Sequence, residues 1–359
     1  MKIVTVIGAR PQFIKAAVVS RAIKQHSDVE EIIVHTGQHF DANMSDVFFE
    51  QMDIPKPDYQ LEIASLSHGA MTGRMLERIE EVLLKEQPDW VLVYGDTNST
   101  LAGALAASKI HIKVAHVEAG LRSFNMRMPE EQNRILTDKL SKILFCPTQS
   151  AKKNLLKEGY IDDANYLPVV GDVMFDAAKF YARRSQKPSE LPLTVQPGRF
   201  VLGTIHRAEN TNDISRLRSL VASLNEICQS EPVVVPLHPR TKAILAANDI
   251  EVDFTILEPV GYLEMVYLLQ HCSLVVSDSG GVQKEAYFFE KPCLVTRDET
   301  EWVELVEHGS NHLVGVEKNK ILAAYDKAKS TDVDYSVPFY GNGHCAEEII
   351  NYLLKSECN

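Results

Sequence analysis

Three carboxylates stand where apolar stretches end in the first half of the chain. Asp96 follows the apolar run 90–94, Glu118 ends the run 114–117, and Glu130 opens a helical stretch. Asp96 could cap the next helix and Glu130 could complement a helix dipole, but a Glu at an apolar strand end is costly without a partner. A crowded set of carboxylates can split its pKa values and supply both an acid and a base. We therefore predict that these three residues are catalytic.

Two glycine-containing turns could bind phosphate. GARPQ at 8–12 and SDSGG at 277–281 each follow an apolar run and open a helix, whose free N–H groups attract anions. The simpler alternative for both is an ordinary turn with solvated charges or a Ser or Asp cap. The candidate ligand contacts are Arg10, Lys15, Ser279, Gly280, Gly281 and Glu285, and Glu285 could reach ribose hydroxyls. The chain has no GxGxxG, which disfavours an NAD site.

His206 begins the segment HRAEN, directly after the apolar run 200–205. An imidazole can titrate near neutral pH or donate to a phosphate. A single histidine is more often structural. Its place at a strand end nevertheless makes it a candidate for the same site.

These candidates require strands that end at a common edge. Apolar runs at 3–7, 32–35, 90–94, 114–117 and 143–146 alternate with amphipathic stretches, and the pattern returns at 200–205, 233–237, 274–277 and 293–296. This alternation of expected strands and helices predicts an α/β protein with two doubly wound Rossmann-like domains facing a cleft. Such sheets bind ligands at the carboxyl ends of their strands. We expect the domains to span 1–169 and 170–345, with a helix at 346–359 packing on the first.

The composition is that of an ordinary globular protein. The 359 residues are 45% hydrophobic and carry a formal net charge of −12, which suits two domains and disfavours nucleic acid and anionic membranes as partners. The six cysteines are scattered without a CxxC pair, so we expect neither zinc nor a disulfide framework. Without a signal peptide or an apolar run of ~20 residues, the sequence predicts a cytoplasmic protein.

Seven motifs together resemble the non-hydrolysing UDP-N-acetylglucosamine 2-epimerases, nearly end to end. They are GARPQFIK (8–15), GQH (37–39), GDTNST (95–100), HVEAGLRS (116–123), PEEQNR (129–134), HRAEN (206–210) and SDSGGVQKEA (277–286). The resemblance implies a glycosyltransferase-B-like fold that closes over UDP, a homodimer, and no NAD or obligatory metal. It places the catalytic residues on Asp96, Glu118, Glu130 and His206. It places the nucleotide contacts on Arg10, Lys15, Ser279, Gly280, Gly281 and Glu285.

The resemblance also implies a reaction. The C2 proton of the sugar is not acidic, because no carbonyl is adjacent. The enzymes that this chain resembles eliminate UDP to give a glycal, protonate C2 from the other face and add UDP back. This route needs cationic and N–H groups for the leaving diphosphate, which Arg10, His206 and the 279–281 turn could provide. It also needs an acid and a base on opposite faces, which the carboxylates could provide.

Particular segments favour one substrate within this family. Residues 35–51 and 122–131 look like the branch that converts UDP-2,3-diacetamido-2,3-dideoxyglucuronate to the mannuronate for lipopolysaccharide O-antigen, and EWVE at 301–304 replaces the Glu-Arg-Pro-Glu of many members. Candidate substrate contacts are Arg122, Arg127 and Arg207 for the sugar carboxylate and amides, and Gln38 and His39 of the GQH motif. The alternatives are a UDP-N-acetylglucosamine 2-epimerase giving UDP-N-acetylmannosamine, a glycosyltransferase, a hydrolysing epimerase and a non-catalytic sensor.

Overall fold

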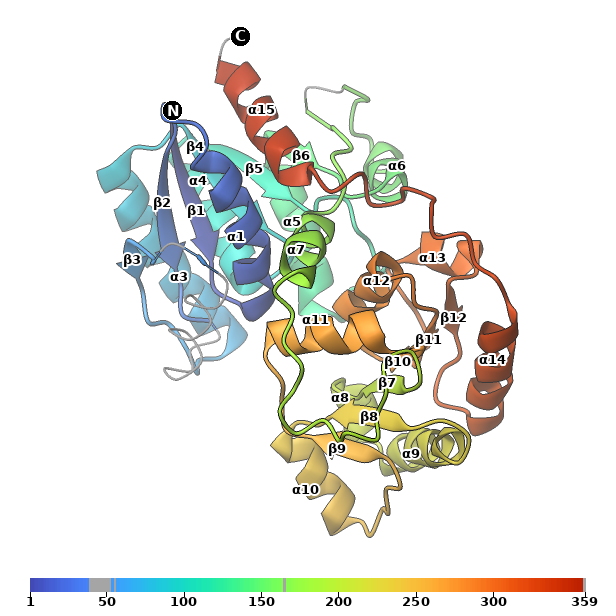
Figure 1. Cartoon of the computed structure of the whole chain (residues 1–359). Coiled ribbons are helices and arrows are strands. Elements are labelled where there is room, and N and C mark those ends of the chain that lie inside the picture. Colours follow the sequence, from blue (N-terminus) through green and yellow to red (C-terminus); the bar gives the residue numbers. More distant parts are fainter. Residues whose placement is uncertain (39–52, 55, 164–165, 358–359) are drawn as a thin grey trace. The chain divides into compact units, whose positions relative to one another are not determined.

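The computed structural model describes residues 1–38, 53–54, 56–163 and 166–357, apart from the side chains of Arg10 and Glu357 (Figure 1). By its internal contacts the chain forms two compact units. One contains Met1–Ala177 and Phe339–Asn359, and the other Ala178–Pro338. Each unit contains one parallel six-stranded sheet with helices, so the predicted α/β fold with two doubly wound sheets is confirmed.

The first unit has the strand order β3-β2-β1-β4-β5-β6. Its strands are β1 (Lys2–Ile7), β2 (Glu30–His35), β3 (Tyr59–Gln60), β4 (Trp90–Tyr94), β5 (Lys113–Val117) and β6 (Ile143–Phe145). Its helices are α1 (Arg10–Ile23), α3 (His68–Glu86), α4 (Asn98–Lys109), α5 (Pro129–Leu140), α6 (Gln149–Lys157), α15 (Cys345–Glu357) and α7 (Val173–Ala182), which leads into the second unit. The strand order reverses between β1 and β4, which is where such sheets form a ligand crevice.

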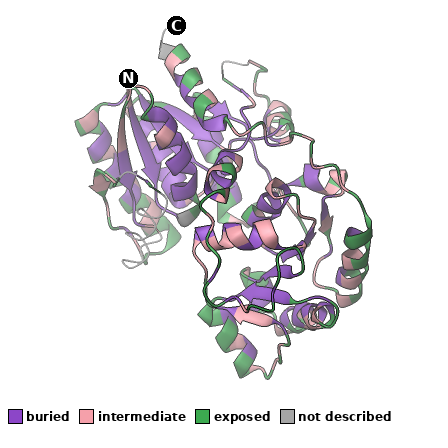
Figure 2. Cartoon of the chain, in the orientation of Figure 1, coloured by how far each residue is buried: buried purple, intermediate pink, exposed green. Residues whose placement is uncertain are grey.

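The second unit has the order β12-β11-β10-β7-β8-β9, with its reversal between β7 and β10. Its strands are β7 (Val201–Thr204), β8 (Val233–Pro236), β9 (Thr255–Leu257), β10 (Leu274–Ser277), β11 (Cys293–Val295) and β12 (Asn311–Leu313). Its helices are α8 (Ala208–Thr211), α9 (Ile214–Cys228), α10 (Pro239–Ala247), α11 (Tyr262–His271), α12 (Gly280–Phe288), α13 (Val303–His308) and α14 (Lys318–Ser330). The central strands of both sheets are buried, and the helices turn exposed faces outward (Figure 2).

Small residues bring α4 close to the sheet of the first unit. Its sequence NSTLAGALAASK is mostly Ala, Gly and short polar residues. A Cβ at Gly103 would lie 3.2 Å from side-chain atoms of Val6 and Val93, so a larger residue would have to push these two valines aside slightly. The close packing sets the start of α4 beside the ends of β1 and β4.

Asp176 of α7 caps the C-terminal helix α15, which packs against α1. Its Oδ2 accepts a hydrogen bond of 2.8 Å from the N–H of Ala346, and the residue is 9% exposed. Burial raises the pKa of Asp176 from 3.8 to about 6, although backbone hydrogen bonds from Ala346 and Cys345 oppose the rise. The cap therefore places a carboxyl group where its charged form is disfavoured.

We expect Asp176→Asn to stabilise the protein near neutral pH. Because folding raises the pKa of Asp176, this group's contribution to stability falls as the pH rises from about 4 to about 6 and stays low above that. Asparagine keeps an acceptor for Ala346 without the charge, so the variant should gain about 1–2 kcal/mol above pH 6. Urea unfolding of both proteins at about pH 4.5 and about pH 7.5 measures the difference. Equal stability at the higher pH would contradict the expectation.

Among the helices described, none combines the length and apolar character of a membrane span.

Candidate active site

Glu118 and Lys15 form an ion pair at the strand ends of the first sheet. The Lys15 Nζ donates to Glu118 Oε2, and both side chains are 9% exposed. A Cβ on Gly95, whose φ is +64°, would lie 3.3 Å from each of these two atoms. The loops after β4 and β5 and the helix after β1 therefore meet around one carboxylate.

The backbone at Glu118 adopts an unusual conformation. Its φ of 72° lies in the left-handed region, where residues other than glycine are uncommon. The N–H groups of Glu118 and Ala119 both donate to the carbonyl of Phe145, at 3.2 and 3.1 Å. Such strain persists where surrounding structure enforces it, and it gathers at functional sites. Here it turns the Glu118 side chain toward Lys15.

Asp96 is held by residues of α5. Arg134 Nη2 donates to Asp96 Oδ2, and Asn133 Nδ2 donates to the Asp96 carbonyl at 2.9 Å. The Asp96 side chain remains 32% exposed, so solvent or a ligand can reach it. Arg134 and Asn133 belong to the PEEQNR motif, but neither was predicted to have a role.

The two glutamates at the start of α5 differ in their surroundings. Glu130 is exposed. Glu131 is 1% exposed, accepts the N–H groups of Ser123 and Phe124 at 3.0 and 2.9 Å, and lies 3.1 Å from Arg134. Glu131 thus holds the loop before α5, while Glu130 stays open to a ligand.

Arg122 lies inside the first unit and not on an open surface. It is 4% exposed, its Nε and Nη2 donate to Glu158 at 2.6 and 2.9 Å, and its Nη1 lies 2.8 Å from Asp138. Burial alone would lower the pKa of Arg122, but the Glu158 hydrogen bonds and the Asp138 charge raise it. The guanidinium therefore connects α5 to the residue that follows α6.

Asp138 also contacts His116, which was not predicted to be a site residue. Its Oδ1 lies 2.7 Å from Nδ1 of His116, whose Nε2 lies 2.7 Å from the Gly95 carbonyl. Both side chains are fully buried. The pair therefore holds the carbonyl of Gly95, and so the turn after β4, in place. Nothing in the spacing of His116 and Asp138 along the chain predicts their contact.

The GQH motif is described only in part. Gln38 Oε1 accepts from the N–H and the hydroxyl of Ser99, at 3.0 and 2.8 Å, so it contacts the first turn of α4. His39 and the side chain of Arg10 lie outside the described residues. Arg127 is exposed and Arg207 is partly exposed.

In the second unit, a buried aspartate joins the ends of β7 and β10. Asp278 is fully buried and accepts the N–H groups of His206 and Arg207 at 3.0 and 3.1 Å, and the amide of Asn210 at 3.1 Å. The His206 side chain is exposed. Asp278 belongs to the SDSGGVQKEA motif but was not predicted to have a role. It fixes the backbone of two predicted ligand contacts, His206 and Arg207.

The SDSGG turn leads directly into α12. Ser279 is the N-cap, and its side chain makes no capping bond within the described structure. Gly281 is exposed, and a Cβ built on it would meet no described atom within 4 Å. Glu285 follows on the same helix and is 6% exposed. The first N–H groups of α12 have no partner within the helix, and the described structure leaves open space beside the Cα of Gly281, as an anion site requires.

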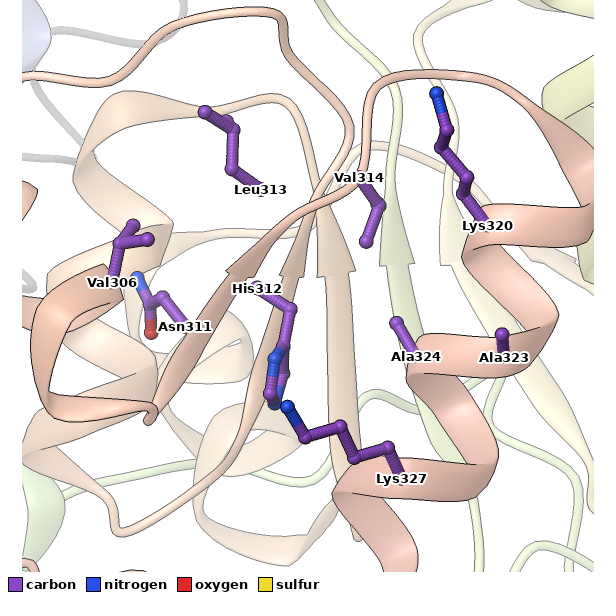
Figure 3. A pocket seen from close by; sticks show the side chains of 9 residues that line it. All are labelled: Val306, Asn311, His312, Leu313, Val314, Lys320, Ala323, Ala324 and Lys327. Carbon is purple, nitrogen blue, oxygen red and sulfur yellow. The ribbon is translucent and has the colours of Figure 1, made fainter.

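A hollow of about 430 Å³ lies elsewhere, between α13, the edge strand β12 and α14 (Figure 3). Figure 3 shows His312 and Lys327 close together on one side of β12 and Val306 of α13 on the other. No residue that lines it was predicted to bind substrate. The strand β11 separates β12 from β10, so the hollow is distinct from the glycine turn.

Two doubly wound sheets, with carboxylates at the strand ends of one and a glycine turn at those of the other, define an enzyme of the glycosyltransferase-B-like class. Residues 21–354 match the family model described as UDP-N-acetylglucosamine 2-epimerase. The chain belongs to this family, whose members are UDP-sugar 2-epimerases and hence isomerases.

Relatives with named activities match almost the whole chain. The UDP-2,3-diacetamido-2,3-dideoxy-D-glucuronate 2-epimerase of Pseudomonas aeruginosa is 58% identical over 99% of this chain and 100% of its own. The structure of Methanocaldococcus jannaschii UDP-GlcNAc 2-epimerase in complex with UDP-GlcNAc and UDP has a TM-score of 0.88 at 43% identity, covering 99% and 100%. The Neisseria meningitidis enzyme bound to UDP-GlcNAc has a TM-score of 0.88 at 33% identity, with the same coverage.

Proposed function

We propose that this protein inverts C2 of UDP-2,3-diacetamido-2,3-dideoxyglucuronate to give the mannuronate, a precursor of lipopolysaccharide O-antigen. The observation that carries the proposal is the Glu118 carboxylate, held in a left-handed backbone beside Lys15 at the strand ends. The 58% identity to the Pseudomonas aeruginosa enzyme supports this substrate. We further propose that the protein acts in the cytoplasm as a homodimer.

In the proposed reaction a carboxylate removes the C2 proton, and the electrons of that C–H bond form a C1–C2 double bond. The bond from C1 to the diphosphate oxygen breaks, and UDP leaves with its electron pair. A second carboxyl group then protonates C2 on the opposite face while UDP returns to C1. We assign the acid and base roles to Asp96, Glu118 and Glu130 as a set.

The diphosphate needs positive partners as it leaves. We assign this role to Arg10, His206 and the N–H groups of the 279–281 turn. Lys15 is also a proposed nucleotide contact, but its bond to Glu118 gives it a second proposed role, which is to fix the position of that carboxylate. The buried Arg122 is proposed to act through its contacts with Glu158 and Asp138, which leaves Arg127 and Arg207 for the sugar carboxylate.

Proton NMR in deuterated water tests the function directly. We expect the purified protein to invert C2 and place deuterium there. Absence of both inversion and exchange with the diacetamido-uronate and with UDP-N-acetylglucosamine would contradict the proposal. Free UDP that accumulates with product would instead identify a hydrolysing epimerase. A glycosyltransferase would need an acceptor, and a sensor would bind the sugar without releasing UDP or glycal.

UDP-N-acetylglucosamine is the second candidate substrate, because the Methanocaldococcus jannaschii structure contains it at 43% identity. Comparing kcat/KM for the two sugars decides between them. We expect the diacetamido-uronate to be preferred, since Arg127 and Arg207 offer cations for its carboxylate.

Gly281→Ala separates ligand binding from folding. An alanine meets no described atom within 4 Å and favours the helix, so stability should stay equal or rise by up to about 1 kcal/mol. The methyl group would occupy the space proposed for the diphosphate, so the affinity for UDP should fall. Thermal unfolding and calorimetric titration measure the two effects. Gly73→Ala in α3, also without a described neighbour within 4 Å, is the matched control and should bind UDP normally. Unchanged UDP affinity in the Gly281 variant would contradict the assignment.

A further inference from the structure

The segment after β11 forms a hydrogen bond with the glycine turn at the start of α12. Trp302 Nε1 donates a hydrogen bond of 2.8 Å to the carbonyl oxygen of Gly280. Trp302 is 4% exposed, so little water competes for this bond. The bond therefore fixes one specific peptide group at the start of the helix.

That peptide group also contains the N–H of Gly281. The peptide bond is planar and trans, so its C=O and N–H point in opposite directions. A bond that holds the Gly280 oxygen toward Trp302 therefore points the Gly281 N–H away from Trp302. This N–H is among the first four of α12, which have no partner within the helix.

Trp302 is held in turn by residues of α12 and by its own loop. The Nζ of Lys284 lies 4.6 Å from the centroid of the indole ring. The backbone N–H of Trp302 donates to Thr300 Oγ1 at 3.2 Å, and the Thr300 hydroxyl donates to Gln283 Oε1 at 2.6 Å. These contacts tie loop and helix together, so the indole acts as a fixed support.

The loop has a second fixed point next to Trp302. Arg297 is 1% exposed and donates from Nη1 and Nη2 to the two carboxylate oxygens of Glu301, at 2.9 and 3.2 Å. A Cβ on Gly280 would lie 3.8 Å from Arg297 Nη1 and 3.9 Å from Glu301 Oε2. Arg297 and Glu301 therefore pack against Gly280. Their two-point hydrogen bonding restricts the movement of the loop.

We propose that Trp302 is a positioning residue that aims the Gly281 N–H at the diphosphate of the nucleotide sugar. The proposal rests on the proposed function, because it takes the 279–281 turn as the diphosphate site. It also gives the EWVE sequence at 301–304 a physical meaning, since the tryptophan supplies the N–H donor to the turn.

Trp302→Phe removes the N–H donor and keeps an aromatic ring beside Lys284. We expect the Kd for UDP to rise by roughly three- to tenfold, the value of one net hydrogen bond, and kcat/KM to fall by at least as much. Trp90→Phe is the control, because Trp90 is buried in β4 of the other unit, and its UDP affinity should be unchanged. A folded Trp302 variant with wild-type Kd and kcat/KM would overturn the proposal.

A second measurement leaves Trp302 in place. The chain contains two tryptophans, so Trp90→Phe makes Trp302 the sole indole. We expect saturating UDP to change its fluorescence emission, because the ligand would bind to the peptide that the indole holds. Unchanged emission with UDP bound, as measured by calorimetry, would also overturn the proposal. If the wild-type protein binds no UDP, the proposed function fails instead, and the two failures are distinguishable.

Discussion

Glu118→Gln is expected to lower kcat by roughly 10²-fold or more, which is the usual contribution of a general acid or base. Glutamine has nearly the same shape but cannot accept or deliver a proton at C2. The Glu118 side chain is 9% exposed and lies beside Lys15. The fall in kcat would therefore arise from this one largely buried carboxylate. The rate of C2 inversion, followed by proton NMR, measures it.

Loss of folding could imitate loss of catalysis in this variant. Removing one partner of a buried ion pair leaves the other charge uncompensated and costs about 3–5 kcal/mol. The double variant Lys15→Met with Glu118→Gln removes both charges. We expect it to regain much of the stability but none of the turnover, as measured by urea unfolding and by the same NMR assay.

An ion pair between the end of α3 and the start of β1 provides the control. Glu86 lies 3.3 Å from Lys2 at the amino end of β1, and its side chain is 16% exposed. We expect Glu86→Gln to leave kcat unchanged. Wild-type turnover in folded Glu118→Gln would remove Glu118 from the catalytic set.

The fold could be predicted because central strands have a strong apolar signal. The runs that end near Ile7, Tyr94 and Val117 became β1, β4 and β5. The strands β3, β9 and β12 were not predicted, because each has two or three residues at a sheet edge and includes a polar one. The equally short edge strand β6 is entirely apolar and was predicted. Edge strands need fewer apolar residues, so they carry less periodicity.

The site was predictable as residue types at strand ends but not as contacts. Glu118 was selected because a charge at an apolar strand end needs a partner. Its pairing with Lys15 joins residues 103 positions apart, and its left-handed backbone is held by hydrogen bonds to Phe145. Likewise, the role of Asp138 arises only when α5 packs beside β5 and brings it to His116. Such long-range bonds leave no spacing signal in one sequence.

The neighbouring glutamates Glu130 and Glu131 provide the sharpest test of the site. Either could be catalytic from sequence spacing alone. Glu130 is exposed, whereas Glu131 is 1% exposed and accepts two loop N–H groups. The same chemical change at adjacent positions should therefore produce opposite effects.

We expect Glu130→Gln to lower kcat by roughly 10²-fold. Its stability should fall by less than about 1 kcal/mol, the value of a carboxylate near a helix N-terminus. Glu131→Gln should instead lose about 1–3 kcal/mol of stability, because a charged acceptor of buried N–H groups becomes neutral. Denaturant unfolding and the NMR turnover assay on both variants separate the two effects.

The comparison is informative because each variant controls for the other. A helix-dipole role for Glu130 predicts a small change in stability and normal turnover, whereas a catalytic role predicts a large fall in turnover from a stable protein. Normal turnover in Glu130→Gln, together with a large loss in a stably folded Glu131→Gln, would move the catalytic role to the buried residue. It would also mean that the loop 123–128 opens during the reaction, because Glu131 would have to release Ser123 and Phe124 before reaching the sugar.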